Sequence, residues 1–211
     1  MIGIFGGTFD PVHFGHLRTV LEVCEVLSLD EVRFVPCGIT PHRAQPLTAT
    51  EDRLTLLTLA LEGADPRFRI DDRELRRSGP SYMVDTLTSI RAEFSDCALC
   101  LILGIDAFQG LPAWHRWRDI FKLAHVVVMQ RPFEPSYADA LERVLAQRLV
   151  TERQVLRDQT AGCIYFQDVS QLAISASRIR DLVRQGRSTQ YLLPETVRHF
   201  IRDKGLYRSP G

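Results

Sequence analysis

The sequence predicts an α/β fold: a Rossmann-like, doubly wound parallel sheet with helices on both faces. Short apolar and β-branched runs alternate with longer segments of helical period along the whole chain. This alternation is typical of parallel strands joined by crossover helices. The 211 residues are 45% hydrophobic and 25% charged, and no shift in composition marks a boundary. We therefore expect a single domain over residues 1–211 with a sizeable core.

The expected strands are the short apolar runs that turn or polar residues bound. They cover Met1–Phe5, Val32–Pro36, Phe68–Asp71, Leu99–Leu103, His125–Met129 and Ile164–Phe166. Between them, apolar residues recur at spacings of three and four, which predicts helices. The expected helices cover Phe14–Leu27, Glu51–Glu62, Tyr82–Phe94, Tyr137–Leu149, Ser177–Gln185 and a last segment that starts at Pro194 and stops before Gly205.

Charge and cysteine content argue against several classes of protein. The 26 basic residues balance 26 acidic ones, which disfavours a general nucleic-acid or membrane binder. No apolar run reaches bilayer-spanning length and the start lacks signal-peptide order, so we expect a cytoplasmic protein. The five cysteines are irregularly spaced, and Cys97-x-x-Cys100 continues into an apolar run. Small core residues are therefore a better interpretation of that pair than a redox or zinc site.

The stretch "GGTFDPVHFGH" follows the first expected strand, where sheets of this kind bind ligands. Gly6 and Gly7 allow the backbone to approach a ligand, and the start of the next helix favours an anion such as phosphate. His13 and His16 are three positions apart, so they share one face of a first helical turn, and Gly15 leaves that face uncrowded. Two imidazoles beside a phosphate indicate charge stabilisation in phosphoryl or nucleotidyl transfer.

An alternative interpretation makes the glycines ordinary turn residues and the histidines partly buried scaffold. The concentration of Gly-Gly, Asp-Pro and His-x-Gly-His in one loop favours the functional interpretation. The stretch also lacks the Gly-Lys-Ser/Thr ending of P-loops and the G-x-G-x-x-G of dinucleotide-binding dehydrogenases.

A second element, "ISASRIR" at Ile174–Arg180, stands near the other end of the chain. Ser177 fits a helix N-cap, which would aim a second positive helix end at the site, and Arg180 is a planar multi-donor cation suited to phosphate. Taken by itself, the element is equally well an ordinary capped helix with arginines in solvent. Its pairing with the first element makes the phosphate interpretation specific.

The two elements together resemble the signature of the nucleotidyltransferase superfamily. The resemblance narrows to bacterial nicotinate-mononucleotide adenylyltransferases through "VPCGITPHR", "GPSYMVDTL", "LILGIDAFQGLPAWHRW", "HVVVMQRP" and "YLLPETVRHFIRDKGLY", and it covers nearly the whole chain. The chain departs from the family pattern at Thr40, which replaces a usual proline, and at Met83, where threonine is common.

The resemblance implies that the protein joins ATP to nicotinic acid mononucleotide, with Mg²⁺ accompanying ATP, on the route to NAD. It implies catalytic roles for His13, His16 and Arg180. Implied ATP-binding residues are Gly6, Gly7, Thr8, Phe9, Gly104, Asp106, Ile174, Ser175 and Ser177. Implied mononucleotide-binding residues are Arg43, Ser81, Tyr82, Thr86, Trp114 and Arg131. No metal site of the protein's own is expected, and the oligomeric state is open.

Several of these assignments have competing interpretations. Asp106 would accept from ribose hydroxyls, or it would only cap a short helix. Arg43 and Arg131 would hold the mononucleotide phosphate, or they would be solvated surface charges. Trp114 would stack on the pyridine ring, with the neighbouring Trp117 as rival and a core aromatic as the alternative for either.

Two rival functions stay open on the sequence alone. Pantetheine-phosphate adenylyltransferases share the first and last elements, but they are typically shorter and keep a lysine near the second strand. A nucleotide-binding module that has lost turnover would keep the fold, and the intact His13, His16 and Arg180 argue against it.

The stretch Gly79-Pro80-Ser81 leads into a helix whose free N–H groups would receive the nicotinate carboxylate.

Overall fold

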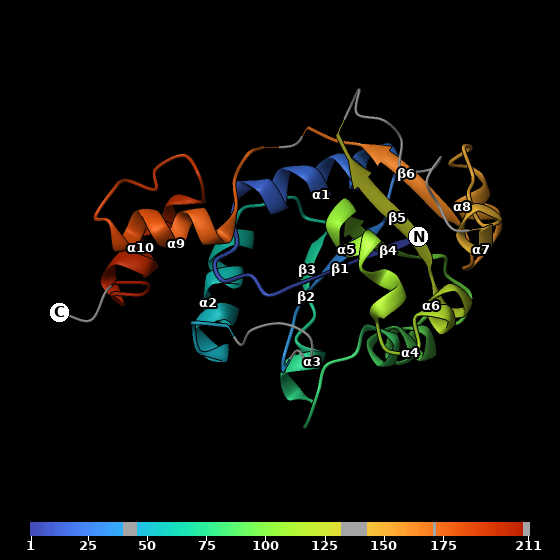
Figure 1. The fold of residues 1–211 in the computed structure, drawn as a ribbon, viewed down its shortest axis with the longest axis horizontal. Helices are drawn as coiled ribbons and strands as arrows, with labels where there is room; N and C mark the ends of the chain where they lie inside the picture. Colours follow the sequence, from blue (N-terminus) through green and yellow to red (C-terminus); the bar gives the residue numbers. More distant parts are fainter. Residues whose placement is uncertain (40–45, 132–142, 171, 209–211) are drawn as a thin grey trace.

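The computed structural model describes residues 1–39, 46–131, 143–170 and 172–208. In this part of the chain, six parallel strands form a sheet in the order β3-β2-β1-β4-β5-β6 (Figure 1). The strands are β1 (Ile2–Gly7), β2 (Glu31–Pro36), β3 (Phe68–Ile70), β4 (Leu99–Gly104), β5 (His125–Gln130) and β6 (Ile164–Asp168). This order is that of a doubly wound sheet, whose switch point lies between β1 and β4. The predicted fold class is confirmed.

Helices connect the strands at most of the expected places. They are α1 (Phe14–Val26), α2 (Thr50–Leu61), α3 (Arg73–Arg76), α4 (Met83–Glu93), α5 (Ile105–Gln109), a 3₁₀ turn (Leu111–Ala113), α6 (Trp117–Leu123), α7 (Arg143–Ala146), α8 (Val155–Asp158), α9 (Ala176–Arg184) and α10 (Glu195–Asp203). Of the expected helix over Tyr137–Leu149, residues 137–142 lie outside the described residues and α7 is shorter than predicted. None of the helices in the described ranges has the length and apolar content to cross a membrane.

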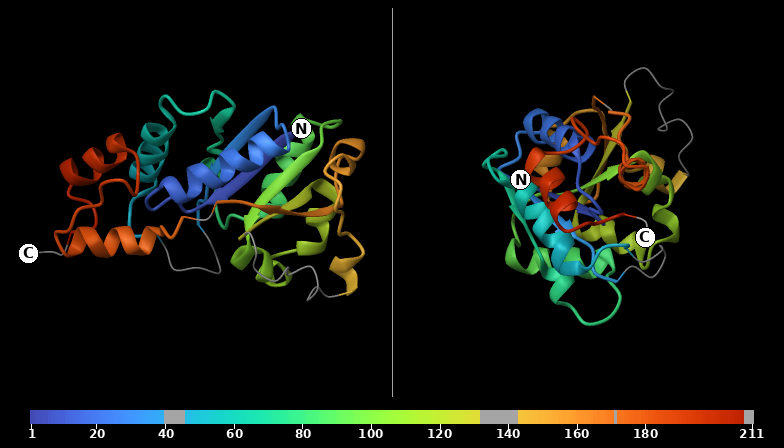
Figure 2. Two further views of the ribbon diagram at one scale, coloured as in Figure 1. Left: turned by 90° about the horizontal axis from the view of Figure 1, so that it is seen from above. Right: turned by 90° about the vertical axis from the view of Figure 1, so that its left-hand side faces the viewer.

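Alternation along the strands divides the core into two layers. On β4, Cys100 and Ile102 point to the side covered by α1 and α2, whereas Leu101 and Leu103 point to the side covered by α4 and α6. The same alternation repeats along β5. Each central strand is therefore buried on both faces, which explains why its sequence is a continuous apolar run. Figure 2 shows the helices on opposite sides of the sheet.

The last two helices extend the molecule beyond the sheet. Figures 1 and 2 show α9 and α10 together at one end, next to the start of α1. The main-chain N–H of Phe14 donates to the Leu192 oxygen at 3.1 Å, which joins the start of α1 to the segment between α9 and α10. The "ISASRIR" element is thereby held beside the first loop, although the two are far apart in the sequence.

Candidate active site

A cleft of about 390 Å³ lies at the carboxyl ends of β1, β2 and β4, where doubly wound sheets bind their ligands. Its walls bring together seven of the predicted site residues: Gly6, Gly7, Thr8, Asp106, Ser81, Tyr82 and Trp114. The first four are predicted ATP ligands and the last three are predicted mononucleotide ligands. One concave surface thus gathers residues from both predicted subsites.

The glycine pair belongs to the strand rather than to the loop. β1 extends to Gly7, which pairs with Pro36 of β2, so the strand ends two residues later than predicted. The prediction missed this extension because glycine has low strand propensity. Pairing with β2 holds Gly6 and Gly7 in place, so the part of the cleft wall that they form is already ordered.

His13 and His16 form a stacked pair at the start of α1. Their ring centroids are 3.7 Å apart and the ring planes are 23° from parallel. His13 occupies the N-cap position with extended backbone, and His16 lies in the first turn. The Nδ1 atoms of both rings are buried without a hydrogen-bond partner in the described structure. Buried polar atoms normally have a hydrogen-bond partner, which water or a bound ligand can supply.

Gly15 is required for this close approach. A Cβ atom at that position would lie 2.9 Å from Nδ1 of His13 and 3.2 Å from the main-chain oxygen of Ile174. Real Cβ atoms are almost never found less than 3.0 Å from another heavy atom, so the first of these contacts would force the structure to shift. The expectation that Gly15 keeps the histidine face uncrowded is confirmed, and the contact with Ile174 explains how the second element packs against the first.

Burial keeps both imidazoles neutral. It lowers the pKa of His13 to about 4 and lowers the pKa of His16 well below its usual value, with a further contribution from the neighbouring His13. The ligand-free site therefore carries two uncharged rings at neutral pH. Its positive character has to come from arginine and from helix ends.

Arg180 joins the two elements directly. Its Nη1 donates to the main-chain oxygen of Asp10 at 2.7 Å and its Nη2 donates to Oγ of Ser177 at 3.1 Å. Its Nε is buried without a partner in the described structure. The guanidinium is thus fixed beside the loop between β1 and α1 and still holds an unused donor.

The N-cap of α9 is Ser175, so the prediction that Ser177 caps this helix is wrong. Oγ of Ser175 accepts from the main-chain N–H of Arg178 at 3.2 Å. Ser175 has extended backbone (φ −133°, ψ 150°), and the helix begins at Ala176. Ser177 lies inside the first turn and presents its hydroxyl to Arg180 instead.

Asp10 connects three distant parts of the chain. Its Oδ1 accepts from the Tyr207 hydroxyl at 2.6 Å, and its Oδ2 accepts from the Leu47 N–H at 2.9 Å. Burial, together with the bond to this carboxylate, raises the pKa of Tyr207. Through these two hydrogen bonds, Asp10 ties the loop between β1 and α1 to the C-terminal segment and to the residues that follow β2. Sequence reasoning took Asp10 only as part of an Asp-Pro turn.

The aromatic wall of the cleft comes from the segment after β4. Trp114 ends the 3₁₀ turn and is half-buried in the cleft, and the Tyr82 ring packs on His115 with centroids 4.3 Å apart. Trp117 lies on α6, is 7% exposed and packs in the core. Trp114 rather than Trp117 therefore lies on the wall of the cleft. His115 is a cleft residue that the sequence analysis did not single out.

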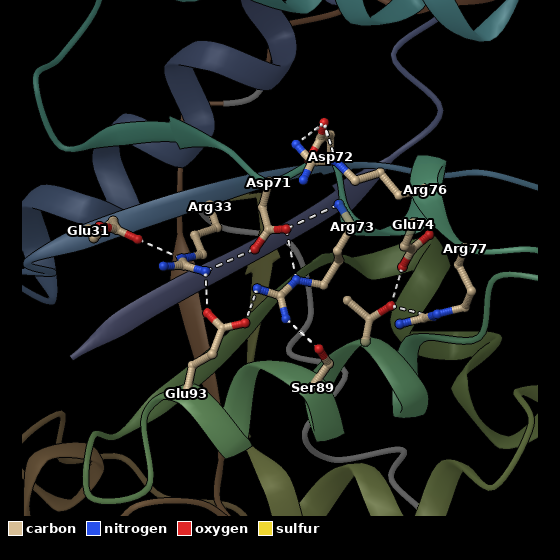
Figure 3. Close-up of polar contacts among 11 residues, drawn as sticks. Glu31, Arg33, Asp71, Asp72, Arg73, Glu74, Arg76, Arg77, Ser89 and Glu93 are labelled. Carbon is tan, nitrogen blue, oxygen red and sulfur yellow. Dashed lines mark hydrogen bonds and ion pairs between the residues drawn. The ribbon is translucent and has the colours of Figure 1, made fainter.

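Thr86, a predicted mononucleotide ligand, lies behind the cleft rather than on its wall. The residue is fully buried, its hydroxyl donates to Oε1 of Glu74 at 2.7 Å, and Nη1 of Arg77 donates to that hydroxyl at 3.2 Å (Figure 3). Glu74 itself lines the cleft, and burial raises the pKa of its carboxyl group. The signal for Glu74 was absent from the sequence, because "RELRR" has the composition of a solvated helix.

An ion-pair network stabilises α4 against the sheet. Arg33 of β2 and Arg73 of α3 both donate to Asp71, at 3.0 and 2.7 Å, and both contact Glu93 at the end of α4 (Figure 3). Side-chain exposure is 18%, 14% and 9% for Arg33, Arg73 and Asp71 and 47% for Glu93, so the Asp71 side of the network is the shielded one. It fixes the position of α4, whose first residues border the cleft.

The stretch before α4 differs from the prediction. The N–H of Ser81 donates to the Ile39 oxygen at 2.7 Å, and the helix begins at Met83 with Tyr82 as its N-cap residue. The Ser81 N–H is therefore already used. Any helix-end donors for a carboxylate come from the first helical residues, Met83 and Val84.

Apart from Asp106, the remaining predicted residues are not among those that line the cleft, or they lie outside the described part. β4 ends at Gly104, which is the N-cap of α5, so the alternative that Asp106 only caps this helix is wrong. The Phe9 side chain is buried. Arg131 follows β5 and is exposed. Arg43 lies outside the described residues.

The cleft at the switch point, the paired histidines at the start of α1 and the arginine on α9 define a nucleotidyltransferase-type α/β protein. The sequence pattern of the family described as cytidylyltransferase-like matches residues 4–182. A probable nicotinate-nucleotide adenylyltransferase of Methylococcus capsulatus is 55% identical over 98% of this chain and 99% of the relative. Its counterpart in Halorhodospira halophila is 49% identical over 99% and 96%. The chain therefore belongs to the nicotinate-nucleotide adenylyltransferase family.

A solved structure supports the fold. Plasmodium falciparum nicotinic acid mononucleotide adenylyltransferase complexed with NaAD superposes with a TM-score of 0.74 over 98% of this chain and 96% of that chain. Because the two sequences are only 16% identical, this similarity establishes the architecture.

Proposed function

We propose that the residues described above carry out the reaction of this family as follows. The reaction is adenylyl transfer from ATP to nicotinic acid mononucleotide, which gives nicotinic acid adenine dinucleotide and pyrophosphate and serves NAD biosynthesis. A phosphate oxygen of the mononucleotide attacks the α-phosphorus of ATP, and the bond to the β-phosphate oxygen breaks. The observation that supports this assignment best is the single cleft shared by Gly6, Gly7 and Thr8 on one wall and Tyr82 and Trp114 on the other.

The nucleophile needs no strong base, since a phosphomonoester has a second pKa of about 6 and is largely ionised at neutral pH. Catalysis then depends on positioning and on stabilising negative charge in the transition state. His13 and His16 suit that task because they are buried, stacked and neutral. Neutral imidazoles donate hydrogen bonds that strengthen as charge grows on the α-phosphate and the leaving pyrophosphate.

The β- and γ-phosphates are assigned to Arg180, Ser177 and the start of α9. Arg180 is already positioned by Asp10 and Ser177, and its Nε is buried without a partner in the described structure. A preoriented guanidinium loses little conformational entropy when it binds a polyphosphate. The positive end of α9 adds to the same field.

We propose that Mg²⁺ enters as part of the ATP substrate. Within the described ranges, His, Cys, Asp and Glu side chains do not form a group of three or more placed to hold a metal. Phosphate oxygens and water are the ligands that Mg²⁺ prefers. Bound there, Mg²⁺ would neutralise charge on the pyrophosphate leaving group.

The mononucleotide is assigned to the side of the cleft formed by Ser81, Tyr82 and Trp114. The indole of Trp114 offers a flat face to the pyridine ring, and the start of α4 offers N–H donors to its carboxylate. Arg131, at the end of β5, is retained as a candidate for the mononucleotide phosphate. Asp106 is retained for ribose hydroxyls, with Gly104, Ile174 and Ser175 near the nucleoside. A cytoplasmic location stays a prediction.

Product identification tests this assignment. The purified protein is incubated with ATP, Mg²⁺ and, separately, nicotinic acid mononucleotide, nicotinamide mononucleotide and pantetheine phosphate, and the products are identified by mass. We expect nicotinic acid adenine dinucleotide and an equal amount of pyrophosphate. Turnover of pantetheine phosphate alone would favour the rival adenylyltransferase, and the absence of pyrophosphate in every mixture would favour a non-catalytic nucleotide-binding module.

A further inference from the structure

Arg53 of α2 is a buried cation that the mechanism above does not use. Its side chain is 1% exposed, and it is among the largest fully buried side chains of the described structure. In the described ranges its side-chain partners are the Thr8 oxygen, Thr50 and Cys37, and none of them is a carboxylate. A buried charge is costly unless hydrogen bonds compensate for the lost hydration. The position therefore requires an explanation in terms of what the guanidinium holds.

The shortest contact of the guanidinium is to the loop that follows β1. Nη1 of Arg53 donates to the main-chain oxygen of Thr8 at 2.9 Å. The other contacts are longer: Nη2 to Oγ1 of Thr50 at 3.5 Å and Nη1 to Sγ of Cys37 at 4.0 Å. Arg53 is thus fixed to a residue that lines the cleft, 45 positions earlier in the chain.

This contact sets the orientation of the peptide group between Thr8 and Phe9. In a trans peptide, the carbonyl and the following N–H point in opposite directions. Since the Thr8 oxygen points toward Arg53, the N–H of Phe9 points away from the buried guanidinium. Phe9 also has a left-handed backbone (φ 50°), which is rare for a bulky residue and persists only where the surroundings enforce it. The hydrogen bond to Thr8 is one such constraint, placed directly before the left-handed residue.

The Phe9 ring connects this constrained loop to His16. Phe9 is 1% exposed, and its ring meets the His16 ring edge-on with centroids 5.5 Å apart. Phe5 packs against both rings, at 5.8 Å from Phe9 and 6.0 Å from His16. A chain of contacts therefore runs from Arg53 through Thr8 and Phe9 to His16.

We propose that Arg53 is a positioning residue for adenylyl transfer: its buried guanidinium holds the Thr8 carbonyl and so fixes the loop that orients His16. The inference rests on the proposed role of His16 at the ATP phosphates. Arg53 itself touches no reacting atom. The ammonium group of a lysine would still donate to the Thr8 carbonyl, but it lacks the several fixed N–H donors of a guanidinium. Lysine at position 53 should therefore restore the function of arginine only in part.

The test compares Arg53→Met with Leu57→Ala. Methionine keeps the length of the side chain without its donors. Leu57 is fully buried one turn further along α2 in the same core layer as Phe9, so its truncation lowers stability without removing a hydrogen bond to the loop. Melting temperatures are measured first, and steady-state kinetics follow at a temperature where all variants are folded. The proposed function fails if the unmodified protein gives no dinucleotide product, which is a different outcome from any of those below.

We expect Arg53→Met to lower kcat by about tenfold or more, since small misplacements of catalytic groups have effects of this size. The KM for nicotinic acid mononucleotide should stay near that of the unmodified protein, and Arg53→Lys should recover part of the lost kcat. Leu57→Ala should melt at a lower temperature with kcat unchanged. The NMR signals of the His16 ring should shift in Arg53→Met and not in Leu57→Ala.

Two results would overturn the proposal: an unchanged kcat in Arg53→Met, or an equal loss of kcat in Leu57→Ala. Should Arg53→Met fail to fold, Arg53→Lys decides the question. A partial loss of kcat with the His16 signals shifted supports the positioning role. A less stable Arg53→Lys protein with unchanged kcat and unchanged His16 signals makes Arg53 a purely structural residue.

Discussion

Arg180 donates a 2.7 Å hydrogen bond to the main-chain oxygen of Asp10, which lies 170 positions earlier in the chain. This bond joins the two sequence elements on which the function depends. It also means that the guanidinium is oriented before any ligand arrives, because one nitrogen is held by Asp10 and a second by Ser177. Preorganisation of this kind lowers the entropic cost of binding a phosphate and of reaching the transition state.

Replacing Arg180 by lysine should therefore not be a mild change. An ammonium group has no fork geometry, so it loses the contact with Asp10, with Ser177 or with the phosphate. We expect kcat/KM for ATP to fall by on the order of a hundredfold, in line with the loss of a charged hydrogen bond that is not replaced. Arg178→Lys, on the same helix but exposed, is the matched control and should behave as the unmodified protein. Unchanged kinetics in Arg180→Lys would leave phosphate binding to the helix end alone.

His16 should contribute more to the transition state than to ATP binding. In the proposed mechanism the stacked pair of His13 and His16 contacts the phosphates of ATP, where donors act on the developing charge. We expect His16→Ala to lower kcat by roughly 10² or more, with a smaller change in the KM for ATP. His199→Ala, on an exposed face of α10, controls for the loss of an imidazole. If His16→Ala kept the original kcat, the assigned role would be wrong.

The sheet and the two signature elements could be predicted because their signals are local. Apolar runs mark the strands, and the glycines and histidines of the first loop are adjacent in sequence. The choice between Ser175 and Ser177 as helix cap could not be predicted, since both are serines and only the extended backbone of Ser175 decides it. Helices as short as α3 and α5 have too few residues to show a helical period.

Two buried ionic residues were invisible to sequence reasoning for a different physical reason. Glu74 and Arg53 sit on helices among polar neighbours, which is the pattern of a solvated face. Their burial is decided by partners far along the chain: Thr86 for Glu74 and Thr8 for Arg53. Only the tertiary structure shows that Glu74 lines the cleft and that the Arg53 guanidinium donates to Thr8, another residue of its wall.

The neutral histidine pair should make stability depend on pH in a known direction. The pKa of His13 is about 4 in the folded protein and near 6.5 when unfolded, so the unfolded chain binds more protons between these values. Stability is then fully present above about pH 6.5 and is lost as pH falls toward about 4. The loss from His13 amounts to about 2 kcal/mol between about pH 7 and pH 5.

Urea unfolding at these two pH values measures the effect. Burial also lowers the pKa values of His16 and His125, which act in the same direction, so the contribution of His13 is the difference between the unmodified protein and His13→Gln. We expect the variant to lose less stability on acidification. An identical loss in both proteins would mean that the His13 ring is not held neutral by burial.

Selectivity for the acid form of the mononucleotide should depend on the start of α4 and on Trp114. The N–H of Ser81 is already donated to Ile39, so the donors for the pyridine carboxylate are those of the first helical residues, Met83 and Val84, reinforced by the helix dipole. A carboxylate accepts from such donors, whereas the amide NH₂ of nicotinamide mononucleotide would face them with donors of its own. We expect kcat/KM for the acid to exceed that for the amide by on the order of tenfold or more.

We predict that Trp114 stacks on the pyridine ring and that its contribution is separable from ATP binding. Trp114→Ala should lower kcat/KM for nicotinic acid mononucleotide and leave the KM for ATP little changed, because the indole lies on the wall with Tyr82 and away from the histidine pair. Trp114→Phe is the matched control: it keeps an aromatic face, so most of the activity should return. Trp117 would be a poor control, since it is part of the core and its loss would destabilise the fold. Equal use of acid and amide, or a Trp114→Ala enzyme with unchanged kinetics, would place the pyridine ring elsewhere in the cleft.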